Sequence, residues 1–191
     1  PYPVPGYEEM TVNNFIAFDS DSKEAIGFDC GPPLPEMRSF AESNNLKWKA
    51  FAITHNHADH VTHFSELAKA CPDAILYAAD KSLDKGIHPL KNGDQFTLGK
   101  LNISVLETPG HARDGLSFVI QGLAKPVVVV GDAIFSTSIG GIRQDYDGSL
   151  AKIRNRILSL DPETLILPGH GPVSSVALEK QHNPFFAENE E

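Results

Sequence analysis

The sequence predicts an α/β fold in which two stacked sheets carry helices on their outer faces, a four-layer αββα sandwich. Strand patterns followed by helical patterns occur in two similar halves of the chain. The β-branched run at residues 126–130 is typical of a strand that is buried on both faces. Because 191 residues suit one hydrophobic core, we expect residues 1–191 to form a single domain.

The first half of the chain contains three strand patterns and two helical patterns. The strands are expected at residues 11–18, 24–29 and 50–54, and the helices at residues 35–44 and 64–71. A polar turn joins the first two strands into an antiparallel hairpin. Pro35 suits the first turn of a helix, where its missing N–H is not needed, and Pro72 stops the second helix.

The second half adds six strand patterns and two helical patterns. The strands are expected at residues 74–79, 95–98, 101–107, 116–121, 126–130 and 164–167, and the helices at residues 149–160 and 173–182. A short helical turn is expected after the first of these strands, and Gly99 and Lys100 form a hairpin turn. Several strands end just before a histidine or aspartate, and loops of this kind present side chains to one cleft.

The charge of the chain excludes several classes of partner. The formal net charge is −9 and the isoelectric point is near 5.3. Without clustered Lys and Arg, neither nucleic acid nor an anionic membrane is an expected partner, whereas a small-molecule substrate is. No apolar run reaches the ~18 residues of a membrane-spanning helix. With two cysteines and no charged, apolar leader, the predicted location is the cytoplasm.

The strongest chemical signal is the segment Thr54-His55-Asn56-His57-Ala58-Asp59-His60, which places four metal-competent side chains within six positions. His55 and His57 point the same way in extended backbone, whereas Asp59 and His60 open the next helix. Imidazole nitrogens and carboxylate oxygens are ligands of zinc, and a catalytic zinc site keeps one position for water. The segment therefore predicts a metal centre.

Four ligands in one loop cannot complete the coordination of two ions, so further ligands are needed. Asp132 can bridge both ions, with His111 finishing one coordination sphere and His170 the other. We expect two divalent ions per chain, with zinc favoured and iron or manganese as alternatives. A lone histidine is more often a helix-start or surface residue, which is our interpretation of His63.

Four spaced motifs resemble the metallo-β-lactamase superfamily, and their order resembles its glyoxalase II-like (hydroxyacylglutathione hydrolase-like) branch of short, single-domain members. The motifs are T-H-x-H-x-D-H at residues 54–60, P-G-H at 109–111, G-D at 131–132 and P-G-H-G-P at 168–172. The C-terminal segment 179–185 is also similar to the tail of such members. The resemblance implies the metallo-β-lactamase fold and a metal-dependent hydrolase.

The resemblance also implies a role for each ligand. One ion would be held by His55, His57 and His111 and a second by Asp59, His60 and His170, with Asp132 between them and Asp29 beside the ligands. Two positions depart from the pattern of the family. Val61-Thr62-His63 stands where small Gly residues are usual, and Ala112 replaces a Thr, so one hydrogen bond around the ligands is not expected here.

The predicted reaction is hydrolysis of a thioester or a related activated ester. Two cations lower the pKa of a shared water, so that a metal-bridging hydroxide attacks while one ion polarises the carbonyl. A thiolate leaves readily near its pKa of about 8.5 and needs no strong general acid. Asp59, which both binds metal and orients the nucleophile, and Asp132 are the predicted catalytic residues. Arg143 and Tyr146, on the loop after Asp132, are candidates for binding an anionic substrate.

Three other activities compete with this hypothesis. An iron-dependent persulfide (sulfur) dioxygenase is the main alternative, because His55, His111 and Asp132 make a two-histidine, one-carboxylate face suited to ferrous iron. A β-lactamase is less favoured, since those enzymes often use Cys where this chain has Asp132. Di-iron redox members resemble H-x-E-x-D-H and carry a flavin domain, so His57 argues against that class.

Overall fold

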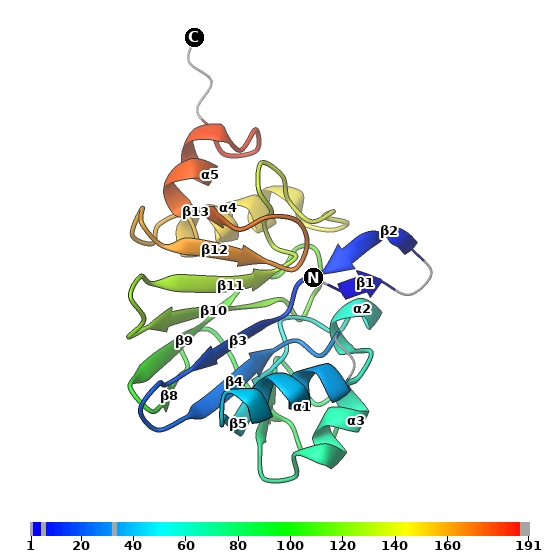
Figure 1. Cartoon of the computed structure of the whole chain (residues 1–191). Helices are drawn as coiled ribbons and strands as arrows, with labels where there is room; N and C mark the ends of the chain where they lie inside the picture. The colour runs from blue at the N-terminus through cyan, green and yellow to red at the C-terminus, as the bar shows by residue number, and fades with distance from the viewer. Residues whose placement is uncertain (1, 5–6, 32–33, 188–191) are drawn as a thin grey trace.

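The computed structural model describes residues 2–4, 7–31 and 34–187. Two sheets lie face to face at its centre, and helices cover their outer sides (Figure 1). This arrangement confirms the predicted αββα sandwich. A separate two-stranded hairpin, β1 (Tyr2–Val4) and β2 (Tyr7–Val12), precedes the first sheet.

The first sheet has the strand order β3-β4-β5-β6-β7. Its strands are β3 (Phe15–Phe18), β4 (Glu24–Phe28), β5 (Lys47–Ala52), β6 (Ile75–Ala78) and β7 (His88–Pro89). β3 and β4 form the predicted antiparallel hairpin, and β4 to β7 run parallel. Parallel neighbours need crossover connections, which here contain α1 (Leu34–Ser43), α2 (Ala58–Val61) and α3 (Phe64–Ala70).

The second sheet has the strand order β13-β12-β11-β10-β9-β8. Its strands are β8 (Gln95–Leu98), β9 (Leu101–Glu107), β10 (Leu116–Gln121), β11 (Val127–Gly131), β12 (Leu165–Pro168) and β13 (Ser174–Ser175). Only β11 and β12 pair in parallel, and α4 (Tyr146–Arg156) crosses between them. α5 (Val176–His182) follows β13.

Three apolar layers hold these elements together. Between the sheets, Ile26 and Phe28 pack against side chains of β9, β10 and β11, and the rings of Phe28 and Phe118 lie 5.4 Å apart. A second layer joins Phe51 to α1 and α3, and a third joins Val128 to α4 and α5. Each fully buried side chain of this size contributes roughly 1.5–3 kcal/mol, so the layers dominate the stability of the fold.

Local polar contacts explain where the expected elements differ from the observed ones. The helical turn expected after β6 is absent among the described residues there, because Asp80 and Asp84 accept hydrogen bonds from the N–H groups of Ser82 and Gly86 and form tight turns. α4 begins at Tyr146, whereas the sequence predicts a start at residue 149. The helix was predicted from its apolar stripe, and its first turn precedes that stripe.

The strand directions bring the predicted ligands to one edge of the sandwich. β4 and β5 are parallel, as are β11 and β12, so within each pair both strands end at the same edge of their sheet. The distance of 3.3 Å between Nε2 of His60 and Oδ1 of Asp132 places the two edges together. Asp29 and His55 follow the first pair, and Asp132 and His170 follow the second. The two sheets therefore supply opposite walls of one site.

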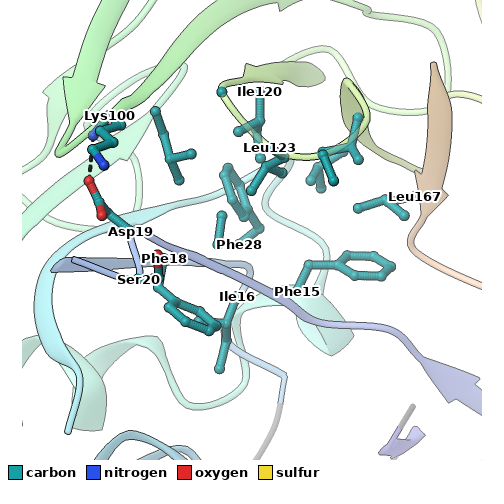
Figure 2. A pocket seen from close by; sticks show the side chains of 16 residues that line it. Phe15, Ile16, Phe18, Asp19, Ser20, Phe28, Lys100, Ile120, Leu123 and Leu167 are labelled. Atoms are coloured by element: carbon teal, nitrogen blue, oxygen red, sulfur yellow. Dashed lines mark hydrogen bonds between the residues drawn. The ribbon is translucent and has the colours of Figure 1, made fainter. Parts of the chain in front are cut away.

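The sandwich also has an apolar cavity of about 460 Å³ between β3 and the strands β10, β11 and β12 (Figure 2). It reaches the turns that precede β4 and β11, so it extends toward the end opposite the predicted ligands. Asp19 closes this end, because its carboxylate accepts hydrogen bonds from the N–H groups of Asp21 and Lys100. Within the described residues, no helix is long and apolar enough to cross a membrane.

Candidate metal centre

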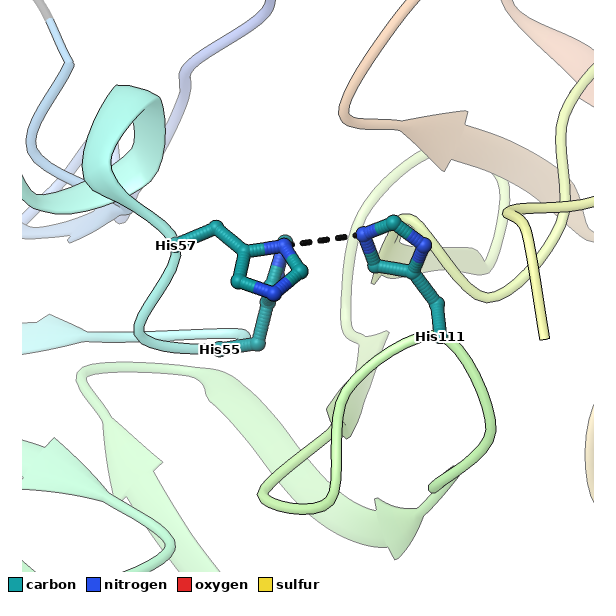
Figure 3. Close-up of side chains that lie close together, drawn as sticks. All are labelled: His55, His57 and His111. Carbon is teal, nitrogen blue, oxygen red and sulfur yellow. Dashed lines mark hydrogen bonds between the residues drawn. The ribbon is translucent and has the colours of Figure 1, made fainter. Parts of the chain in front are cut away.

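Three histidines from two loops form the first group of candidate ligands. His55 lies just beyond β5 and is 3% exposed. Its Nε2 lies 3.1 Å from Nδ1 of His57, and the same Nδ1 lies 2.9 Å from Nε2 of His111. Figure 3 shows the rings of His57 and His111 pointing toward each other from separate loops. The three side chains offer ligand atoms within 4.8 Å of one another, which is the spacing of donors around a single ion.

The second group combines two residues of α2 with the histidine that follows β12. Asp59 and His60 lie in the first turn of α2, and His170 joins them from the opposite sheet. Nε2 of His170 lies 3.2 Å from Oδ2 of Asp59. Nδ1 of His170 lies 2.7 Å from the carbonyl oxygen of Thr11, so Nδ1–H donates there and Nε2 keeps its lone pair for the site.

Asp132 lies between the two groups. Its Oδ2 is 3.4 Å from Nε2 of His111 and 3.4 Å from Nε2 of His170, one member of each group. Its Oδ1 is 3.3 Å from Nε2 of His60. One carboxylate thus reaches both sets of nitrogens, as the sequence predicts for a bridging residue.

Three buried atoms in this cluster lack a hydrogen-bond partner: Nε2 of His60, Nδ1 of His111 and Oδ1 of Asp132. Nε2 of His60 and Oδ1 of Asp132 are both unpaired, although they are only 3.3 Å apart, because their directions do not meet hydrogen-bond geometry. A buried polar atom without a partner costs about 1–3 kcal/mol, and more when it is charged. A cation between the two groups would satisfy both atoms, and the nitrogen and oxygen donors suit zinc, iron or manganese. The residues present therefore fit a metal centre.

Asp29 orients His60 from behind. Its backbone has φ +63°, a left-handed conformation that short polar residues tolerate. Its Oδ2 accepts from Nδ1–H of His60 at 2.7 Å and from the hydroxyl of Thr54 at 2.9 Å, while Oδ1 accepts from the N–H of Thr54 at 2.7 Å. These contacts turn Nε2 of His60 toward Asp132, the role that carboxylates beside metal-binding histidines perform.

The electrostatics of the cluster follow from burial and crowded charge. Burial lowers the pKa of His60, but Asp29 and Asp132 outweigh it and raise this pKa to about 10. Burial and the neighbouring charge of His60 lower the pKa of His55 to about 2. Burial raises the pKa of Asp132, yet the neighbouring imidazoles of His170 and His60 outweigh it and hold this pKa well below its ordinary value. Without a cation, the proton on His60 carries positive charge that Asp132 requires, and Asp132 also raises the pKa of His170 although burial lowers it.

A pocket of about 610 Å³ opens beside His57 and His111. Arg143 lines it together with Arg113, Asp114 and Asp80, three residues that the sequence analysis did not identify. Arg113 and Asp114 lie two and three residues after His111, so the argument used for the loop after Asp132 would also have found them.

The remaining predicted residues lie outside this pocket. Tyr146 is 48% exposed at the start of α4 and is not brought into the lining. His63 precedes α3 as a helix-start residue, as expected, and its Nδ1 lies 3.4 Å from Glu66. It belongs to none of the candidate ligand groups of the described residues.

Comparisons with known proteins agree with this geometry. Residues 12–170 match the metallo-beta-lactamase superfamily, and the chain belongs to it. A hydroxyacylglutathione hydrolase of Hahella chejuensis is 31% identical over 169 residues, which are 88% of this chain and 64% of that protein. The chain thus spans less than two thirds of that relative. The predicted glyoxalase II-like branch is confirmed by this similarity.

Two solved structures are similar over most of their lengths. The BLEG-1 B3 metallo-beta-lactamase is 28% identical with a TM-score of 0.80, covering 93% of this chain and 95% of that one. TTHA1623 in a di-iron-bound form is 26% identical with a TM-score of 0.77, covering 97% and 100%. The chain is therefore a member of a superfamily of metal-binding hydrolases that includes glyoxalase II homologues.

We expect Asp29→Asn to weaken metal binding about tenfold to a hundredfold. The Asn side chain is neutral, and its NH₂ group takes the place of one carboxylate oxygen of Asp29. This NH₂ group then faces another donor, either the N–H of Thr54 or the groups that donate to Oδ2 in the wild-type protein. Chelator competition measures the affinity, and Asp73→Asn, an exposed aspartate, is the matched control. Equal affinities in the two variants would show that Asp29 does not orient His60 for the ion.

The metal-free protein should lose stability as the pH rises from 6.5 to about 10. The folded-state pKa of His60 is raised from 6.5 to about 10, so its contribution is fully present below 6.5 and disappears as the proton leaves. One proton changes the free energy of unfolding by at most about 1.4 kcal/mol per pH unit. Thermal melts in chelator, with Asp29→Asn for comparison, measure this loss. A wild-type profile no steeper than that of the variant would contradict the assignment.

Proposed function

We propose that this chain is a hydrolase that uses two divalent ions to cleave a thioester or a related activated ester. The observation that carries the proposal is the position of Asp132 between two groups of ligands that draw on both sheets. In this proposal His55, His57 and His111 hold one ion, Asp59, His60 and His170 hold the other, and Asp132 bridges them. The di-iron form of TTHA1623 supports a two-ion site of this kind.

When bound, two such ions lower the pKa of a water toward neutrality and polarise a carbonyl oxygen. The chain supplies the rest. The side chain of Asp59 is 19% exposed beside His170, so it would be placed to accept a hydrogen bond from a water held at the ions and to orient it. Asp132 keeps the nitrogens of His111 and His170 at fixed separation. The pocket beside His57 holds the substrate so that its carbonyl reaches the centre.

A thioester is the favoured substrate class for two reasons. A thiolate leaves without a strong acid, and the sequence motifs contain no additional group placed to donate a proton. The hydroxyacylglutathione hydrolase of Hahella chejuensis also supports this class. We propose zinc as the ion, with iron and manganese as the other ions that these donors accept.

An activity panel on the metal-loaded protein tests the proposal. Zinc, iron and manganese forms are each assayed with a small thioester, an ester, a β-lactam and a persulfide, with oxygen consumption followed for the last. We expect hydrolysis of the thioester, and a loss of at least a hundredfold in kcat in Asp132→Asn, because the bridge between the ligand groups is weakened. The β-lactam is included because BLEG-1 is similar over most of the chain. Turnover of the β-lactam alone, or oxygen uptake with persulfide, would replace thioester hydrolysis by another activity.

Arg143→Ala should raise KM for an anionic thioester about tenfold and change kcat less than twofold. Arg143 lines the pocket and belongs to none of the candidate ligand groups of the described residues, so we expect its contact to be made equally in the ground state and the transition state. Loss of one charge-assisted hydrogen bond at an exposed site accounts for a factor of this size. Steady-state kinetics with a carboxylate-bearing thioester and its methyl ester measure the effect. Arg38→Ala, an exposed arginine on α1, is the control, and an unchanged KM in Arg143→Ala would remove this residue from the substrate site.

A further inference from the structure

Two buried polar side chains of α5 contact a turn at residues 135–138. Glu179 is 1% exposed and Asn183, which ends the helix, is 0% exposed. Oε2 of Glu179 accepts from the N–H of Thr137 at 2.9 Å and from Nδ2 of Asn183 at 2.8 Å, and Oε1 accepts from the hydroxyl of Ser174. Three donors thus satisfy a carboxylate that water does not reach, which is the condition for keeping a charge buried.

The turn held by these side chains has an unfavourable backbone conformation. Phe135 and Ser138 exchange backbone hydrogen bonds of 3.0 and 3.2 Å around it. Thr137, at its tip, has φ +58°, a left-handed conformation that β-branched residues rarely adopt. Asn183 Nδ2 donates to the carbonyl oxygen of Ser138 at 3.0 Å. Glu179 and Asn183 therefore hold the tip and one end of a turn that its own residues do not favour.

The loop that contains this turn touches the candidate metal centre at two points. The ring of Phe135 lies against the ring of His170, with centroids 5.9 Å apart and planes inclined by 73°. Gly140 packs so closely that a Cβ there would lie 1.9 Å from the carbonyl oxygen of Asp132 and 2.9 Å from the ring of His111. A shift of the loop would therefore displace, or clash with, three of the candidate ligands: His170, Asp132 and His111.

We propose that Glu179 and Asn183 are positioning residues for the metal centre and the substrate pocket. They act through the loop between Asp132 and Arg143, which carries the turn, the contact with His170 and one wall of the pocket. The inference rests on the proposed function for its kinetic consequences only. Its structural consequences, the protection of the turn and the retention of metal, do not depend on which substrate is cleaved.

The test compares three substitutions on α5 in the zinc-loaded protein. Glu179→Ala removes the acceptors. Glu179→Gln keeps the shape, because its amide oxygen can accept from Thr137 and Asn183 while its NH₂ donates to the hydroxyl of Ser174. Lys180→Ala changes the neighbouring exposed residue of the same helix and is the matched control.

In Glu179→Ala we expect the amide of Thr137 to exchange with solvent at least tenfold faster, while the amides of β11 keep their protection. We also expect about tenfold weaker retention of zinc in chelator competition, and a KM for the carboxylate-bearing thioester raised about tenfold. Glu179→Gln should recover most of each loss. If Glu179 served only overall stability, its substitution by Ala would lower the melting temperature without changing KM. Recovery in Glu179→Gln would then be unrelated to the exchange rate of the Thr137 amide.

Two results would overturn the inference. The first is unchanged exchange at Thr137 together with unchanged zinc retention in a folded Glu179→Ala protein. The second is the same loss of zinc in Lys180→Ala as in Glu179→Ala. If the wild-type protein cleaves no thioester, the proposed function fails on its own, and the exchange and zinc measurements still decide whether α5 positions the centre. If Glu179→Ala does not fold, Asn183→Asp, which replaces a donor by an acceptor at nearly the same volume, is subjected to the same measurements and the same criteria.

Discussion

The buried carboxylate of Asp132 faces three imidazole nitrogens at 3.3 to 3.4 Å, and the site around it is organised by this crowding of charge. A carboxylate removed from water needs positive charge or donors close by. In the chain alone the pKa of His60 is raised to about 10, so that its ring carries this charge, and Asp132 raises the pKa of His170 as well. A single divalent cation between these side chains would supply the same positive charge. The candidate ligands are thus also residues whose crowding around a buried carboxylate makes a cation favourable.

The scaffold keeps this arrangement because both sheets end at it. Parallel pairs in each sheet bring Asp29 and Asp132 to the same edge, and apolar layers on both sides of each sheet keep the strands from moving. Polar contacts set the finer orientation. Asp29 fixes the ring of His60, and the backbone carbonyl of Thr11 fixes the ring of His170. The candidate ligands therefore follow strands that are packed on both faces, and hydrogen bonds orient their rings.

The proposed substrate pocket belongs to a different part of the structure. The pocket beside His57 is lined by loop residues of both signs, with Arg113 and Arg143 accompanied by Asp80 and Asp114. Arg113 donates to the side chain of Gln144 at 3.0 Å and so links the two loops that form the wall. Similar structures include a protein named as a β-lactamase, which shows that this fold alone does not define the substrate. The sequences of these loops can vary while the strand ends that carry the candidate ligands keep their positions.

The sequence by itself determined the αββα layers and the seven candidate ligands, because both depend on short-range patterns. Apolar periodicity identifies strands and helices, and the spacing of His55 to His60 places donors on one loop whatever surrounds it. Contacts between distant segments were decided only by the tertiary structure. The buried pairing of Glu179 with Thr137 joins positions 42 residues apart, and the exclusion of Tyr146 from the pocket depends on where α4 begins. Neither follows from local spacing, because each depends on how one element packs against another.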